Sequence, residues 1–469
     1  MASNHPPQPA MLPSPLSPLQ KRKRILFIHP DLGIGGAERL VVDAAVGLQD
    51  RGHSVTVYTS HCDSRHCFDE ARNGTLTIRV SGNSIVPRNI LGRFNILCAI
   101  LRQLHLVASL ILSNEISNYD CLFIDQLSAC IPLFYLFAPH IPVLFYCHFP
   151  DYLLASRTSL IKSLYRIPFD WIEAVTTGLA STILVNSNFT RGVFSTAFPR
   201  IERVPHVVYP CVDVTERKSV LKDDEPSFLA GDGRKILLSI NRFERKKNIE
   251  VGIKALACLS EEERKRIRLI IAGGYDPRVH ENISYHHELT TLCESYGFKH
   301  ITCKNFITSL SIPEDTDVLF LLSIPASWKA YLLKASSLLL YTPEREHFGI
   351  VPLEALIAEL PVLAQNSGGP LETITEGVTG WNRPNNPEKW AEVIRQALFE
   401  MSPTEIKAMG RKGRERVIRE FSKEKMAERL EAEFDAVPPV NGGRFWRLLL
   451  LAGGIATAGV GAGMMVFKS

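Results

Sequence analysis

The chain has 469 residues, of which 45% are hydrophobic and 22% charged, and this balance excludes a disordered or fibrous protein. Its 53 lysines and arginines exceed its 49 acidic residues by four, a surplus too small for nucleic-acid binding through bulk charge. None of the ten cysteines forms a Cys-x-x-Cys pair, which disfavours a zinc ribbon or a disulfide scaffold and favours free thiols in a reducing compartment.

The N-terminal segment, residues 1–23, is rich in proline and ends in a basic run. It lacks the apolar core of a secretory signal, so we predict a disordered, cytosolic leader.

The first predicted domain, residues 24–214, alternates strands with helices. Arg24–His29 is a short apolar run, a glycine turn follows, and Glu38–Leu48 has apolar residues at helical spacing before the strand Val55–Thr59. This order predicts a parallel α/β sheet. Further strands are predicted at Cys121–Asp125, Val143–His148 and Ile183–Asn186.

A charged linker, residues 215–234, precedes a second predicted α/β domain, residues 235–430. Strand Lys235–Ile240, helix Ile249–Leu259 and strand Leu269–Ala272 repeat the pattern of the first domain. Further strands are predicted at Val318–Leu322, Ser337–Tyr341 and Pro361–Ala364. Residues 275–343, which hold His280, His286 and His287, are interpreted as an insertion without an assigned function.

Three apolar segments are candidates for contact with a membrane. Ile90–Leu112 and Ile131–Cys147 carry charges or prolines, so we expect buried elements or a membrane-facing surface rather than spans. Residues 448–467, which follow a second linker at 431–447, contain no charge and are long enough to cross a bilayer. We predict a C-terminal transmembrane anchor there, with the upstream residues in the cytosol, and a buried or interfacial helix is the alternative.

The glycine turn Gly33–Gly36 opens the first predicted helix. Adjacent glycines let backbone N–H groups approach a ligand, and a helix N-terminus favours an anion. The order of the glycines is not that of a dinucleotide fingerprint. A tight turn without a ligand therefore stays open beside an anion site.

Two basic residues, Arg242 and Lys247, follow the first strand of the second domain. Open α/β sheets bind ligands at the carboxyl ends of their strands, where a guanidinium and an ammonium suit a diphosphate. A solvated basic loop is the alternative.

Two glutamates, Glu346 and Glu354, lie eight residues apart with Gly349 between them. If a helix begins near Gly349, both carboxylates can face one cleft and grip sugar hydroxyls. The spacing alone is weak, because solvated helices often carry such pairs, but the stretch Asn366–Pro370 after the next strand makes it more specific.

These motifs carry a family resemblance over residues 24–430. The stretches are HPDLGIGGAERLVVDAA, YCHFPD, LSINRFERKKN, EREHFGIVPLEA and NSGGPLETI. They resemble the retaining GT-B glycosyltransferases with an E-x7-E motif, a group similar to glycosyltransferase family 4, whose fold is two facing Rossmann-like domains. Within that group they are most similar to the mannosyltransferases of dolichol-linked oligosaccharide assembly.

The resemblance implies the reaction. Mannose would pass from GDP-mannose to Man-GlcNAc2-diphosphodolichol, through an α-1,3 and then an α-1,6 linkage, to give Man3GlcNAc2-diphosphodolichol with retained configuration. It implies an endoplasmic reticulum membrane protein with cytosolic catalytic domains, other glycosyltransferases of the pathway as partners, and no nucleic acid. No cofactor or metal is expected, since arginine and lysine take the electrostatic role.

The resemblance also implies residue roles. Arg242 and Lys247 would hold the donor diphosphate. Glu346 would contact the mannose hydroxyls and Glu354 the ribose. The catalytic set would be Glu346, His148, Arg242 and Lys247; the donor-binding set would add Gly35, Gly36, His347, Phe348, Gly349, Ile350 and Glu354; the acceptor-binding set would be Asp151 and Arg157. His148 would lie near the reacting carbon, and a satisfied core histidine is its alternative.

Two other functions stay open at this point. One is a lipid-acceptor transferase of the same fold that uses UDP-N-acetylglucosamine, because no local residue fixes the base of the nucleotide. The other is a non-catalytic scaffold subunit, against which the intact motifs argue.

Overall fold

The computed structural model describes residues 22–90, 93–155, 157, 159–214, 233–303 and 312–437. The predicted anchor at 448–467, and most of the predicted leader and of the linker at 215–234, lie outside the described residues.

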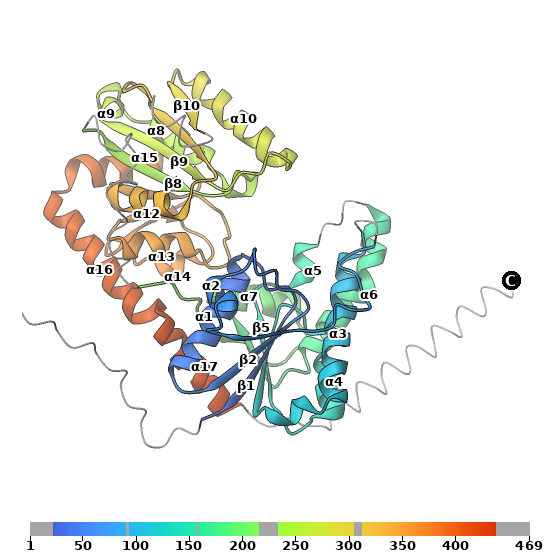
Figure 1. Cartoon of the computed structure of the whole chain (residues 1–469). Coiled ribbons are helices and arrows are strands. Elements are labelled where there is room, and N and C mark those ends of the chain that lie inside the picture. The colour runs from blue at the N-terminus through green and yellow to red at the C-terminus, as the bar shows by residue number, and fades with distance from the viewer. Residues whose placement is uncertain are drawn as a thin grey trace, which may run out of the picture. The chain divides into compact units, whose positions relative to one another are not determined.

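Two parallel seven-stranded sheets, flanked by helices, form the fold (Figure 1), so the α/β prediction is confirmed. The first sheet has the order β3-β2-β1-β4-β5-β6-β7. Its strands are β1 (Arg24–His29), β2 (Ser54–Thr59), β3 (Thr77–Val80), β4 (Cys121–Asp125), β5 (Val143–Cys147), β6 (Thr182–Val185) and β7 (His206–Val207). The accompanying helices are α1 (Gly36–Asp50), α2 (Asp69–Arg72), α3 (Asn95–Leu112), η1 (Glu115–Asn118), α4 (Ile131–Phe137), α5 (Asp151–Leu154), α6 (Leu160–Thr177) and α7 (Asn188–Ala197).

The second sheet has the order β10-β11-β9-β8-β12-β13-β14. Its strands are β8 (Lys235–Ile240), β9 (Ile267–Gly273), β10 (His300–Cys303), β11 (Val318–Leu322), β12 (Leu338–Tyr341), β13 (Val362–Gln365) and β14 (Gly380–Arg383). The helices that go with it are η4 (Arg245–Lys247), α8 (Glu250–Ala257), α9 (Glu261–Lys265), α10 (His280–Ser295), α12 (Ala326–Ala335), α13 (Ile350–Ile357), α14 (Pro370–Thr373), α15 (Pro387–Arg395), η5 (Gln396–Glu400), α16 (Pro403–Phe421) and α17 (Lys423–Ala436).

The chain separates into two compact units, whose boundary does not coincide with the linker between the sheets. One unit holds residues up to Leu144 together with those from Phe434 onward, and the other holds Phe145–Glu433. The boundaries fall within β5 and within α17, so the second unit contains the end of that strand and most of that helix.

In the first unit, β1 lies between β2 and β4. Five of its six residues are buried, because a strand covered on both faces needs apolar side chains in succession. Helix α1 buries the face that carries Leu40, Val41 and Leu48, and it begins two residues before the predicted helix Glu38–Leu48.

Helix α3 is long and apolar enough to cross a membrane by length and composition, and 39% of its most apolar stretch is buried. It buries the face that includes Cys98, Leu106 and Leu110, as a helix packed on a sheet does. The other apolar segment, Ile131–Cys147, comprises α4 and then β5. Both segments thus contain buried elements.

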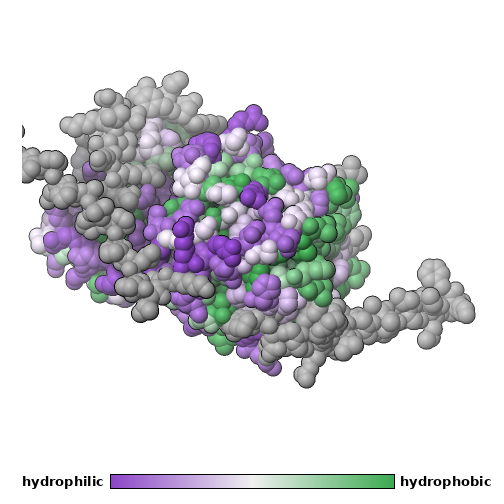
Figure 2. Space-filling model, turned by 60° about the horizontal axis from the view of Figure 1, so that its bottom comes forward, coloured by the Kyte–Doolittle hydropathy of each residue, from purple (hydrophilic) through white to green (hydrophobic). Residues whose placement is uncertain are grey.

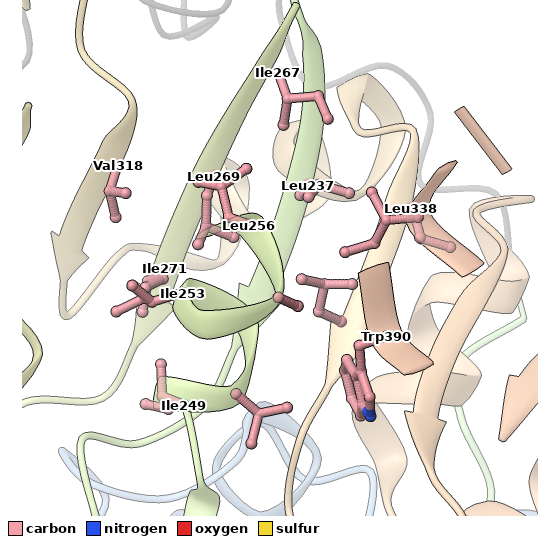
Figure 3. Close-up of a cluster of buried hydrophobic side chains, with 14 of the residues drawn as sticks. Leu237, Ile249, Ile253, Leu256, Ile267, Leu269, Ile271, Val318, Leu338 and Trp390 are labelled. Carbon is pink, nitrogen blue, oxygen red and sulfur yellow. The ribbon is translucent and has the colours of Figure 1, made fainter. Parts of the chain in front are cut away.

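In the second unit, helix α8 packs over the strands of the second sheet. Figure 3 shows Ile253 and Leu256 of α8 among Leu237 and Leu269 of neighbouring strands, with Trp390 of α15 beside them. Complete burial of such a side chain contributes about 1.5–3 kcal/mol, so this cluster is a main source of stability for the unit.

The interpretation of residues 275–343 as an insertion is wrong. They contain α10, β10, β11, α12 and β12, and β11 is paired on both sides, with β10 and β9. His286 lies on α10, where it faces the ring of Phe320 and bonds Thr302, with 3.0 Å between its Nε2 and the Thr302 Oγ1. Among the described residues, no three His, Cys, Asp or Glu side chains are grouped so as to hold a metal ion. His286 therefore belongs to the packing of the domain, whereas His280 and His287 are exposed on α10.

Candidate active site

A lysine–glutamate ion pair lies at the carboxyl edge of the second sheet. Lys247 ends η4, just after β8, and its Nζ lies 2.5 Å from Oε2 of Glu346, which follows β12. The side chains are 14% and 22% exposed. The buried hydroxyl of Thr342 donates to the backbone carbonyl of Lys247 at 2.7 Å and fixes the loop. This edge is where open α/β sheets bind their ligands.

The charges of this pair depend on each other. Burial alone would raise the pKa of Glu346, but the Lys247 ammonium outweighs it and holds that pKa below the ordinary glutamate value. Burial, and then the nearby carboxylate of Glu346, raise the pKa of Tyr341 well above its usual range. Glu346 is therefore ionised and Tyr341 neutral at physiological pH.

The loop that carries Glu346 rests on the stretch Asn366–Pro370. The N–H of Gly369 donates to the carbonyl of Glu346 at 2.8 Å. A Cβ on Gly369 would lie only 2.2 Å from the carbonyl oxygen of Phe348, and Gly368 has a φ of +70°. Both glycines are thus needed for the close approach of two backbones, which gives this motif a structural reason.

Helix α13 positions Glu354. Gly349 precedes it with a φ of +88°, and the ring of Tyr341 leaves little room for a side chain there. Glu354 pairs with Lys329 of α12, and its charge is among those that raise the pKa of Tyr341. Glu346 also raises the pKa of Tyr341, so both carboxylates act on this buried side chain. That the two glutamates face one cleft stays a prediction.

His347 connects this loop to other parts of the same unit. Its ring stacks on Phe149, with 3.8 Å between centroids and 7° between planes, and its carbonyl accepts from the Ser187 hydroxyl at 2.5 Å. Burial first, opposed by Glu346, lowers the pKa of His347, and the neighbouring His148 contributes to the lowering. His148 and the Glu346–His347 loop therefore share one electrostatic environment.

Other predicted residues have partners elsewhere. Arg242 is exposed and pairs with Glu244 at 3.0 Å. Asp151 pairs with Arg166 at 2.7 Å, and Arg157 pairs with Asp170 at 2.6 Å. The Phe348 side chain is buried in the core, and Ile350 begins α13. Gly35 and Gly36 belong to the first unit.

Three residues of the site were not predicted. Lys329 neutralises Glu354, and Ser187 holds the carbonyl of His347. Glu372 accepts the backbone N–H groups of Asn188 and Phe189 at 2.8 and 2.9 Å, so it caps α7. Only Glu372 had a sequence signal, because it lies within the stretch NSGGPLETI on which the resemblance rests.

Known proteins match both halves of the chain. Residues 34–216 match the family described as Glycosyltransferase Family 4, and residues 222–416 match Glycosyl transferases group 1. Among solved structures, sucrose-phosphate synthase from Thermosynechococcus elongatus has a TM-score of 0.65 and 19% identity, with 92% of this chain and all of that chain covered. Anabaena HepE has a TM-score of 0.61 and 18% identity, with 88% and 100% covered. These structures establish the fold, which is that of a GT-B glycosyltransferase.

Relatives with higher sequence identity show which kind of glycosyltransferase this chain resembles. The alpha-1,3/1,6-mannosyltransferase alg-2 of Neurospora crassa is 52% identical over 452 residues, which cover 94% of this chain and 96% of that protein. The corresponding protein of Saccharomyces cerevisiae is 45% identical over 442 residues, with 89% and 86% covered. The chain therefore belongs to the alpha-1,3/1,6-mannosyltransferase family.

Proposed function

We propose that the chain transfers mannose from GDP-mannose to Man-GlcNAc2-diphosphodolichol, first through an α-1,3 and then through an α-1,6 linkage, with retained configuration. Family membership supports the reaction type. The observation that carries the assignment to this site is the Lys247–Glu346 pair, a cation and a carboxylate held together where a sheet of this kind binds its ligand.

Lys247 has the chemistry needed for the leaving group. When the bond between sugar and phosphate breaks, negative charge grows on the diphosphate, and a fixed ammonium nearby stabilises it. This ammonium pairs with the carboxylate of Glu346. The donor diphosphate then shares the lysine with the carboxylate, while Arg242, which is exposed and pairs with Glu244, can swing to the same phosphates.

The two glutamates take different parts in the proposal. Glu346 is ionised and adjoins the cation for the leaving group, so it faces the sugar where positive charge develops. Glu354 lies on α13, which follows the loop of Glu346, and it pairs with Lys329. Its position beyond that loop suits the hydroxyls of the ribose. In the proposal His148, beside His347, lies near the reacting carbon. Asp151 and Arg157, which come later in the chain, bind the acceptor.

The proposal requires no metal and no cofactor. The ammonium of Lys247 and the guanidinium of Arg242 supply the positive charge that a divalent cation supplies in other transferases. Transfer should therefore be unaffected by a chelator such as EDTA. A loss of activity that added Mg²⁺ or Mn²⁺ restores would contradict this part of the proposal.

The proposed place of the protein is the endoplasmic reticulum membrane, with the catalytic residues in the cytosol. Helix α6 supports membrane contact because it exposes an apolar stripe, with Leu160, Leu164 and Ile167 at 83%, 66% and 57% exposure and Trp171 at one end. Figure 2 shows hydrophobic residues gathered along one side of the described surface. Carbonate extraction of the full chain and of a variant without residues 444–469 tests the anchor: identical behaviour would contradict it.

A direct assay tests the reaction. Purified protein is supplied with labelled GDP-mannose and a phytanyl-linked Man-GlcNAc2-diphosphate. Addition of two mannoses, with the linkages read by α-mannosidases of known specificity, supports the proposal. Transfer from UDP-N-acetylglucosamine in place of GDP-mannose would point to a different transferase. No turnover with either donor would leave a scaffold subunit.

A further inference from the structure

A buried histidine lies beneath the glycine turn of the first unit. His29 ends β1 and Asp125 ends the neighbouring strand β4, and their exposed fractions are 1% and 0%. The Nδ1 of His29 lies 2.6 Å from Oδ1 of Asp125. Its Nε2 lies 3.1 Å from the backbone carbonyl oxygen of Asp31, two residues before Gly33. The histidine thus joins the strand ends to the start of the turn.

Both ring nitrogens of His29 face acceptors. A backbone carbonyl only accepts, and an ionised carboxylate only accepts, so satisfying both contacts needs a hydrogen on each nitrogen. The imidazolium form supplies both hydrogens. Burial alone would lower the pKa of His29, but Asp125 and, more weakly, Glu38 of α1 raise it above the ordinary histidine value. The surrounding charges and the two hydrogen-bond contacts both favour the imidazolium form of His29.

A second cation holds the same segment from α3. Arg102 is 5% exposed, and its Nη1 lies 3.2 Å from the Asp31 carboxylate while its Nη2 donates to the carbonyl of Ser60. Asp31 is therefore held at its carbonyl by His29 and at its carboxylate by Arg102. The next N–H, of Leu32, donates to the carbonyl of His61 at 2.8 Å.

The glycine turn after Asp31 has few side chains of its own to hold it. Gly35 is the N-cap of α1, and no side chain caps the first N–H groups of this helix, whose N-terminus by its polarity favours an anion. The Glu38 carboxylate lies over Gly35, since a Cβ there would fall 2.2 Å from its Oε2. Glycine leaves the turn many conformations, and its position must therefore be fixed from residues outside it.

We propose that His29 is a positioning residue for sugar transfer, whose Nε2–H fixes the Asp31 carbonyl and thereby places the Gly33–Gly36 turn for the phosphate-bearing substrate. The proposal rests on the proposed function and on the expectation, implied by the resemblance, that Gly35 and Gly36 bind the donor. His29 itself, beneath the turn, does not touch the substrate. Its contribution is to order the turn before the ligand arrives, which lowers the entropic cost of binding.

Two variants separate the two nitrogens. A glutamine amide reaches the position of Nε2 and an asparagine amide that of Nδ1. We combine each with Asp125→Asn, so that no unpaired carboxylate remains buried. His29→Gln with Asp125→Asn keeps a donor for the Asp31 carbonyl, whereas His29→Asn with Asp125→Asn does not. Both lose the same ion pair, so their stabilities should differ only by the hydrogen bond to the Asp31 carbonyl.

The matched control lies at the other end of the same two strands. Arg24 begins β1 and pairs with Asp120, which directly precedes β4, at 3.1 Å. Asp120→Asn removes an interaction between the same strands at the amino edge, far along the chain from the glycine turn. It should leave both the turn and the transfer reaction as they are in the wild type.

The expected result is a split between the two His29 variants. The asparagine variant should show faster hydrogen exchange at residues 31–36 and a KM for GDP-mannose raised about five- to tenfold, with kcat less affected. The glutamine variant should resemble the wild type in both. Equal exchange and equal KM in the two variants would overturn the proposal. If the wild-type protein transfers no mannose, the proposed function fails, and the exchange data alone decide whether His29 positions the turn.

Discussion

Removal of the Lys247 ammonium should separate the structural from the chemical role of the ion pair. In Lys247→Met the carboxylate of Glu346, only 22% exposed, loses its partner. Breaking a buried pair from one side costs about 3–5 kcal/mol, and the remaining exposure reduces this to about 2–3 kcal/mol. The pKa of Glu346 should rise at the same time, because only the weaker charges of His347 and Lys246 then oppose the effect of burial.

The double variant Lys247→Met with Glu346→Gln should regain most of that stability, since no unpaired charge is left. It should not regain activity. Loss of the cation that opposes the charge of the leaving diphosphate should reduce kcat/KM by about a hundredfold or more in both variants. The assays are urea denaturation and transfer of labelled mannose, with Lys246→Met, an exposed neighbour paired with Glu244, as control. Recovery of transfer in the double variant would refute the chemical role.

Three further outcomes are expected. Glu354→Gln should act mainly through the KM for GDP-mannose, whereas Glu346→Gln should lower kcat; a Glu354 defect that persists in kcat at saturating donor would contradict the ribose assignment. Gly369→Ala should lower the thermal stability and the activity together, because its Cβ would meet the Phe348 backbone, and a melting curve that matches the wild type would speak against the close packing. Burial raises the pKa of Glu173 to about 7 although it accepts from two backbone N–H groups; the folded state therefore holds this proton more tightly than the unfolded state, and stability should fall as pH rises from about 4.5 to 7. In Glu173→Gln that part of the pH dependence should vanish, as measured by denaturation at several pH values.

The central strands were predictable because of how parallel sheets are buried. Strands covered on both faces are runs of apolar residues, and the predicted segments Cys121–Asp125, Val318–Leu322 and Lys235–Ile240 coincide with β4, β11 and β8. The edge strands β3, β7, β10 and β14 were not predicted. All four residues of β3 are at least partly exposed, so polar side chains interrupt the pattern there.

The site was predictable where its chemistry is local in sequence. Glu346 and Glu354 lie on one loop and the helix after it, so their spacing is visible in the sequence. Lys247 lies in η4, the first helical turn after β8. Lys329 was not predicted, because its pairing with Glu354 depends on how α12 packs beside α13. Ser187 was missed for the same reason, since its partner lies 160 residues away. The error over residues 275–343 came from the length of this stretch, which in fact supplies β10, β11 and β12 to the second sheet.

The end of α17 has a consequence for biosynthesis. The ammonium of Lys23, just before β1, donates to the carbonyl of Phe434 at 2.7 Å and pairs with Asp435 at 2.6 Å. Phe434 and Asp435 lie 411 and 412 positions after Lys23 in the chain. At about 5–20 residues per second, the ribosome synthesises them about 20–80 s after Lys23. Until then the segment before β1 in the nascent first unit lacks these contacts and is accessible to chaperones. A fragment that ends at the linker 215–234 would lack them permanently.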